Sequence, residues 1–251
     1  MKVISTLFLV LLFCTSYVQA KDALDLPSVV DKALNRFEQT PRYDWSFVKE
    51  SHEDEEGELT ELKEIFTPSG ALADGWQLVT YNGKPPSKKR LKKYRKNIQK
   101  RYAQETNSKA EEGEEQSFSI NIRNLIEMDS LTLSSETETQ WVIAFNVLFN
   151  EMGIDAEGNL DGLLYLDKRA GYIEKIAISN NDSFSPAFSA KITQLNLTLA
   201  FTNIEENILP LEVSMIMKGT FAFMAEINET QTTRYTDYRY QPYNIEAVSS
   251  N

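Results

Sequence analysis

The stretch QLNLTLAF, residues 194–201, alternates strictly between polar or small side chains and large apolar ones. Its apolar positions are Leu195, Leu197, Leu199 and Phe201. Successive side chains of a β-strand point to opposite faces, so the stretch predicts a strand with one dry and one wet face. Strands of this kind are typical of antiparallel sheets.

The same period of two recurs along most of the chain. In order, it appears at Tyr43, Trp45 and Phe47; at Phe118, Ile120 and Ile122; at Trp141, Ile143, Phe145 and Val147; at Leu211, Val213, Met215 and Met217; and at Phe221, Phe223, Ala225 and Ile227. Residues 156–159 and 168–171 supply turn chemistry between strands. The pattern predicts a mainly β (α+β) fold with a curved antiparallel sheet of about eight to eleven strands.

Helical periodicity is confined to two segments. The first opens at Leu26-Pro27-Ser28 and ends before Thr40-Pro41, with apolar residues at three- and four-residue steps. The second runs from Ser87, a suitable N-cap after Pro85-Pro86, to about Tyr102. Its apolar stripe comprises Leu91, Tyr94, Ile98 and Tyr102.

The first twenty residues predict a cleaved secretory signal peptide. Lys2 precedes an uncharged apolar run, residues 3–13, and Ala20 stands before Lys21. Cys14 leaves a lipoprotein signal open, although Phe13 occupies the position before it where Gly, Ala or Ser is usual. We expect residues 21–251 to form a single domain without cysteine, which favours a bacterial periplasm.

Charge and composition exclude several classes of function. The net charge of −11 becomes −12 when Lys2 is removed, and so acidic a chain is not suited to nucleic acid. His52 is the single histidine, which argues against a histidine-based catalytic site or a multi-histidine metal site. We expect no enzyme activity, no catalytic residue, no metal and no cofactor, although a hydrolase with a carboxylate pair stays open.

One charged insertion, at about residues 84–116, interrupts the strand pattern. Ten Lys and Arg residues lie between Lys84 and Arg101, and five glutamates follow between Glu105 and Glu115. The two halves either screen each other in solvent or present a basic face to an anionic membrane surface or an acidic envelope protein. The predicted basic surface comprises Lys88, Lys89, Lys92 and Lys93.

Aromatic residues on the predicted strand faces are candidates for a binding cavity. They are Trp45, Phe47, Trp141, Phe145, Phe201, Phe221 and Phe223. Each is also an ordinary core residue. Two short helices cannot cover so large a sheet, so the sheet must curl or leave apolar surface to be filled by a ligand.

The order of segments resembles the LolA-like periplasmic family of lipoprotein carriers and their relatives. The resemblance runs from the first helix through YDWSF at 43–47 and FTPSG at 66–70 to GLLYLDKRAGYIEKI at 162–176. It continues through residues 191–201, 208–211 and 218–221 to YTDY at 235–238. The resemblance implies an unclosed half-barrel with capping helices around a hydrophobic cavity that accepts acyl chains.

The sequence therefore predicts a soluble periplasmic protein that binds or carries a lipid, an acyl chain or a lipidated protein. The alternative is a non-enzymatic envelope interaction or sensing module of the same fold with a filled core. Neither alternative involves nucleic acid.

Overall fold

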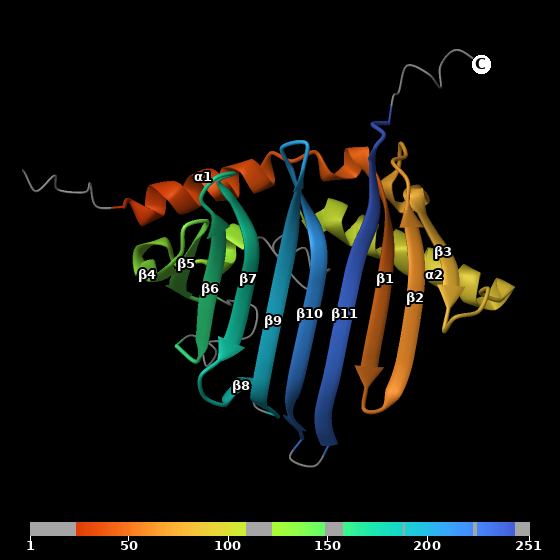
Figure 1. Ribbon diagram of the computed structural model, residues 1–251. Coiled ribbons are helices and arrows are strands. Elements are labelled where there is room, and N and C mark those ends of the chain that lie inside the picture. The colour runs from red at the N-terminus through yellow and green to blue at the C-terminus, as the bar shows by residue number, and fades with distance from the viewer. Residues whose placement is uncertain (1–23, 109–121, 149–157, 188, 223–224, 244–251) are drawn as a thin grey trace, which may run out of the picture.

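The computed structural model describes residues 24–108, 122–148, 158–187, 189–222 and 225–243 (Figure 1). The predicted signal peptide, together with Phe118, Ile120 and Phe223, lies outside these ranges. The helices are α1 (Leu26–Glu38) and α2 (Lys88–Ser108), with 3-10 turns η1 (Arg42–Asp44), η2 (Leu72–Gly75), η3 (Ile122–Leu125) and η4 (Met128–Ser130). The strands are β1 (Trp45–Glu55), β2 (Glu58–Phe66), β3 (Trp76–Tyr81), β4 (Thr132–Glu136), β5 (Gln140–Asn146), β6 (Leu160–Asp167), β7 (Tyr172–Asn180), β8 (Phe184–Ala187), β9 (Ala190–Ile204), β10 (Asn207–Phe221) and β11 (Ala225–Tyr240).

All eleven strands belong to one antiparallel sheet, as the alternating pattern predicts. The order is β3-β2-β1-β11-β10-β9-β7-β6-β5-β4, and β8 pairs with β9 to one side of this path. The C-terminal strand β11 pairs with β1, which joins the two ends of the chain at the middle of the sheet. The two end strands β3 and β4 do not pair with each other, so the sheet is an unclosed half-barrel.

Both helices begin at capping residues that the sequence supplies. The carboxylate of Asp25 accepts a hydrogen bond from the Ser28 N–H at 3.2 Å at the start of α1. At the start of α2, the Ser87 hydroxyl accepts one from the Arg90 N–H at 3.2 Å, as expected of an N-cap. The second helix continues beyond the predicted end at Tyr102 to Ser108.

The register of the strands places the two helices on the same face of the sheet. Lys49 pairs with Glu64 and Tyr235, and Ser51, two residues further along β1, pairs with Thr233. Thr233 pairs in turn with Val213, and Val213 with Leu199, so these side chains share one face. We call it the inner face; in Figure 1 both helices lie behind the sheet, with the outer face toward the viewer.

Four details of the predicted strands are wrong. Leu211 lies at a register shift of the β9–β10 pair, so it is 46% exposed instead of sharing the inner face with Val213. Tyr43 belongs to the 3-10 turn before β1 and is exposed, because Pro41 and the turn that follows it delay the extended backbone. Ile122 opens another 3-10 turn instead of ending a strand. Residues 221–227 do not form one strand: the chain reverses after Phe221, where Ala222 adopts a φ of +49°, and β11 starts at Ala225.

Candidate binding site on the inner face

The part of the inner face beneath α1 is a packed apolar core. Helix α1 buries Val30, Ala33, Leu34 and Phe37 because these residues recur on one side of the helix. The Phe37 ring meets Phe201 of β9 edge to face, with ring centroids 5.0 Å apart. The strands contribute a continuous apolar layer to the same cluster: Ile143, Phe145, Leu160, Leu164, Leu166, Ile173, Ile176, Ile178, Leu195, Leu197, Leu199 and Phe201.

A guanidinium group fixes α1 to the segment that follows the charged insertion. Arg123 donates to Asp31 at 2.6 Å, to Asn35 at 2.9 Å and to Glu38 at 2.8 Å. The hydrogen bond from Arg123 holds the pKa of Asp31 below its usual value, and the two acids raise the pKa of Arg123. These contacts seat α1 over its half of the sheet.

An aromatic cluster occupies the inner face beneath α2. Phe47 of β1 stacks on Phe66 of β2 with centroids 5.3 Å apart, and both rings contact Trp76 of β3. Tyr235 and Tyr238 of β11 pack on the other side of the cluster, with their ring centroids 5.7 and 5.6 Å from that of Phe47. Strands far apart in the sequence thus build one aromatic floor.

A buried carboxylate lies beside this aromatic floor, under α2. Glu64 is 2% exposed and accepts hydrogen bonds from the Lys49 ammonium at 2.9 Å and the Tyr94 hydroxyl at 2.8 Å. The Lys49 nitrogen also lies 5.6 Å from the centre of the Trp76 ring. A buried charge is tolerated when it is paired and hydrogen-bonded, and both conditions hold for Glu64.

Hydrogen bonds, more than apolar burial, hold α2 on the sheet. The Trp76 indole donates to the Tyr102 hydroxyl at 2.7 Å. Tyr94, about 2.2 turns nearer the start of the helix, donates to Glu64. Ile98, which is 2% exposed, lies between these two tyrosines in the sequence. Burial, reinforced by the Glu64 carboxylate, raises the pKa of Tyr94, so its hydroxyl remains a donor.

Between the two covered regions runs a strip of partly buried apolar side chains on the inner face. Val213, Met215 and Met217 of β10 point inward in succession, and Ile227 of β11 lies at the same end as Met217. We call these four residues the methionine strip. Across β11 the inner face becomes polar, because Met217 pairs with Glu229, Met215 with Gln231 and Val213 with Thr233.

The six predicted cavity residues that the structure describes do not lie together. Phe145 and Phe201 are buried in the core beneath α1, and Trp141 packs against it. Trp45 is buried and Phe47 partly buried at the aromatic cluster beneath α2, on the other side of the methionine strip. Phe221 ends β10 with 51% of its surface exposed, and Phe223 lies outside the described residues.

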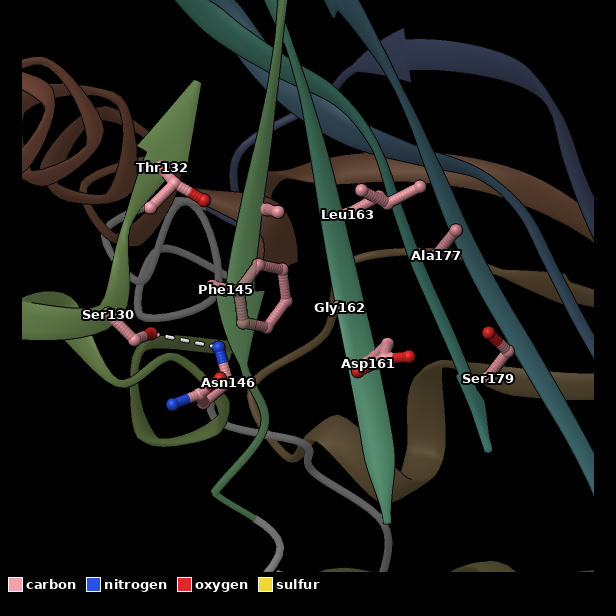
Figure 2. A pocket seen from close by; sticks show the side chains of 10 residues that line it. Ser130, Thr132, Phe145, Asn146, Asp161, Gly162, Leu163, Ala177 and Ser179 are labelled. Atoms are coloured by element: carbon pink, nitrogen blue, oxygen red, sulfur yellow. Dashed lines mark hydrogen bonds between the residues drawn. The ribbon is translucent and has the colours of Figure 1, made fainter. Parts of the chain in front are cut away.

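A groove of about 430 Å³ lies at the opposite side of the sheet (Figure 2). Ala144, Asp161, Leu163, Ala177 and Ser179 line it, and they alternate with core residues along β5, β6 and β7. The groove is therefore on the outer face, and its half-polar lining does not suit an acyl chain. A second depression, of about 370 Å³, is formed by the acidic turns at Glu56 and Glu226.

Gly162 explains how Phe145 reaches the lining of this outer groove while remaining buried. The Phe145 ring lies directly over Gly162, and a Cβ atom built there would come within 2.3 Å of the ring. The missing side chain makes room for the aromatic ring across the β5–β6 pair.

Sequence reasoning missed the Glu64 cluster and the methionine strip as functional candidates. The sequence pattern assigned Met215 and Met217 to a strand and gave no sign that they would remain partly exposed. Glu64 lies between Leu62 and Phe66 at strand spacing, and that position is the one signal that placed a charge on the inner face.

Neither a metal centre nor a membrane-spanning helix emerges from the part of the chain that the structure describes. No group of three or more His, Cys, Asp or Glu side chains there has a metal-binding arrangement. His52 is exposed, with its Nδ1 3.3 Å from a Glu61 oxygen. No described helix is both long and apolar enough to cross a bilayer.

The fold and the inner face together define a class: an open antiparallel half-barrel with two helices on one face. No protein-family model matches the chain, and no curated protein sequence matches it. Two solved structures are similar to it over most of its length. A DUF1329 family protein from Desulfovibrio piger has 8% identity and a TM-score of 0.35, covering 88% of this chain and 95% of its own.

The other similar structure is a Vibrio parahaemolyticus domain named for outer membrane lipoprotein sorting. It has 10% identity and a TM-score of 0.37, covering 89% of this chain and 95% of its own. The assignment of a half-barrel to this chain rests on its own strand order.

Proposed function

We propose that this chain is a non-enzymatic periplasmic binding protein that holds an acyl chain, of a lipid or a lipidated protein, against the methionine strip. The observation that carries the proposal is the partial exposure of Val213, Met215, Met217 and Ile227 on the inner face between two covered regions. Methionine side chains are flexible and polarisable, and they suit apolar ligands of variable shape.

The surroundings of the strip support an acyl ligand in particular. Leu195 and Leu197 pair with Met217 and Met215, so the apolar surface continues from β10 into the buried face of β9. Gln231 and Thr233 flank the strip on β11 and offer hydrogen-bonding groups beside it. Burial of a chain yields about 0.8 kcal/mol per methylene, or on the order of 12 kcal/mol gross for a 16-carbon chain.

The proposal includes a periplasmic location and a function without catalysis. The signal peptide predicted at residues 1–20 and a mature chain without cysteine support export to the periplasm. The ionisable group most deeply enclosed among the described residues, Glu64, is paired with Lys49 and Tyr94 and supports α2 rather than facing an open cleft.

Binding of a fluorescent fatty acid to the purified protein tests the proposal. The double substitution M215Q/M217Q should weaken binding by about tenfold or more, because it places amides against the acyl chain. The matched control is I216Q, since Ile216 lies between the two methionines and points to the outer face. Binding that is absent from the wild type, or unaffected by M215Q/M217Q, would contradict the acyl site.

A second candidate function has one observation in its favour. Phe145 and Phe201, predicted to line a cavity, are packed in the core beneath α1. A filled core favours an interaction module of the cell envelope that carries no lipid. Mass spectrometry of lipids extracted from the natively purified protein distinguishes the two, because the interaction module should yield none.

A further inference from the structure

The surface of α2 that faces away from the sheet is a continuous array of cations. Leu91, Tyr94, Ile98 and Tyr102 point toward the sheet and are buried or partly buried, as the helical stripe predicts. The exposed side chains between them include Lys88, Lys89, Lys92, Lys93, Arg95, Lys96, Lys100 and Arg101. We call these eight residues the basic face of α2.

The basic face carries an electrostatic cost for the first turns of its own helix. No acidic residue occurs between Lys88 and Gln104, so the like charges Lys88 and Lys92, or Lys92 and Lys96, meet at four-residue spacing and repel each other. The first turn contains Lys88, Lys89 and Arg90 but no acid, and cations at a helix N-terminus oppose the helix dipole. Attachment to the sheet through Tyr94, Tyr102 and Ile98 must offset these costs.

The composition of the basic face fits a diffuse anionic surface better than a folded protein partner. Six of its eight cations are lysines, which act as point charges, whereas arginine is the residue suited to bidentate recognition. Protein interfaces are depleted in lysine and rely on aromatic anchors. The described exposed residues interspersed with these cations, Asn97 and Gln99, supply no such anchor.

We propose that the basic face of α2 docks the protein on an anionic phospholipid surface. The net charge of −11 would otherwise repel the protein from such a surface, so the local cations determine which side approaches. In Figure 1 the β1–β2 turn, with exposed Glu55, Glu56 and Glu58, lies at the lower edge of the sheet, away from α2. Docking through α2 keeps this acidic turn off the membrane. The inference is independent of the acyl site.

The test is co-sedimentation with phosphatidylcholine vesicles that contain or lack phosphatidylglycerol, at low and high salt. A lysine close to an anionic bilayer strengthens partitioning by a factor of about five, attenuated over the Debye length. The wild type should therefore bind the anionic vesicles at low salt, release them at high salt and ignore neutral vesicles. The substitution K88Q/K89Q/K92Q/K93Q should weaken binding by more than about tenfold.

The matched control removes four exposed cations from other surfaces, in the variant K32Q/R169Q/K191Q/K218Q. It changes the net charge by the same amount, so it should retain most of the binding. Equal losses in both variants would overturn the proposal, because binding would then depend on total charge alone. Failure of the wild type to bind anionic vesicles would also overturn it, and capture on immobilised poly-glutamate in that case would point to an acidic protein instead.

Two further measurements separate this inference from the acyl site and from misfolding. The circular dichroism spectrum of the α2 variant should match that of the wild type, because the four lysines are exposed. Fatty-acid binding by the α2 variant should also be unchanged. Loss of vesicle binding together with an altered spectrum would contradict the assignment of these lysines to surface docking.

Discussion

The two helices cover the same face of the sheet by different means. Helix α1 buries four apolar side chains against the strand layer, and its Arg36 donates hydrogen bonds to Ala170 and Glu206 in the turns that connect the strands. Helix α2 is mostly charged, and it meets the sheet through Ile98 and through hydroxyl groups that bond Glu64 and Trp76. The half of the inner face under α1 is therefore covered mainly through apolar burial, and the half under α2 depends more on hydrogen bonds.

This difference has an energetic consequence. Apolar burial is tolerant of small shifts, since it depends on the area removed from water. A buried charged group is not tolerant, because its desolvation must be offset by partners in correct positions. Mutations under α1 should lower the free energy of unfolding in proportion to the side-chain volume removed. Mutations under α2 should lower it according to which buried polar group loses its partner.

The largest effect is expected from the substitution Glu64→Ala. It would leave the Lys49 ammonium enclosed with 16% side-chain exposure and without its carboxylate. Breaking a buried ion pair costs about 3–5 kcal/mol, so we expect a loss near 4 kcal/mol in the free energy of unfolding. Urea denaturation measures it. The double variant K49M/E64L, which removes both charges, should be considerably less destabilised; equal losses would refute the role of the orphaned lysine.

The substitution Leu34→Ala tests the α1 side. Leu34 is fully buried, and its truncation should lower the free energy of unfolding by about 3 kcal/mol through lost burial and the cavity left behind. Leu34→Met, which roughly conserves volume, should cost less than about 1.5 kcal/mol. A comparable loss in both variants would mean that shape rather than volume decides packing under α1.

Tyr94→Phe removes one hydroxyl from the α2 side and leaves the ring in place. The Glu64 carboxylate then loses a hydrogen bond but keeps Lys49, so we expect a loss of about 1.5 kcal/mol. Urea denaturation again provides the measurement, with Tyr102→Phe as the parallel change at Trp76. If Tyr94→Phe had no effect on stability, the hydrogen bond would not contribute to holding α2.

The last prediction concerns alkaline pH, where an effect should arise on the α2 side. Burial raises the pKa of Tyr235 from 10.0 to about 12, with the Glu64 charge adding to it. Between about pH 10 and 12 the unfolded chain loses this proton while the folded chain keeps it, so stability is present below pH 10 and falls as pH rises. Tyr235→Phe should flatten this fall. Denaturant midpoints across this range, with phenolate absorbance as a second probe, would detect it.

Much of the architecture could be predicted because its signals are local. Along residues 194–201 the period of two specifies a strand whose inward side chains are the ones found inside. Along residues 211–217 it gives the correct face for Val213, Met215 and Met217 but not for Leu211, which lies at a register shift and is 46% exposed. The helix starts were predicted from Leu26-Pro27-Ser28 for α1 and from the Ser87 cap for α2. The turn at 168–171 also lies where its residue types placed it, between β6 and β7.

The error at residues 221–227 arose where the sequence carries no strong local signal. The reversal after Phe221 contains no Gly, Pro or Asn next to it, and Ala222 takes a positive φ that its residue type does not announce. The candidate site was harder still. Period-two alternation shows that Phe201 and Met215 face the same way, but not that α1 covers the first and leaves the second partly exposed. Coverage depends on where a distant helix lies.

The unclosed sheet has a consequence for the behaviour of the protein at high concentration. Among the described residues, β3 and β4 each pair along one side only, and such free edges invite pairing between molecules. Strand β4 has five residues, all exposed, and its pairing with β5 shifts register between Leu133 and Ser135. A short, irregular strand that ends in Glu136 is a poor template for another chain. At the β4 edge, the open half-barrel is thus protected against pairing between molecules.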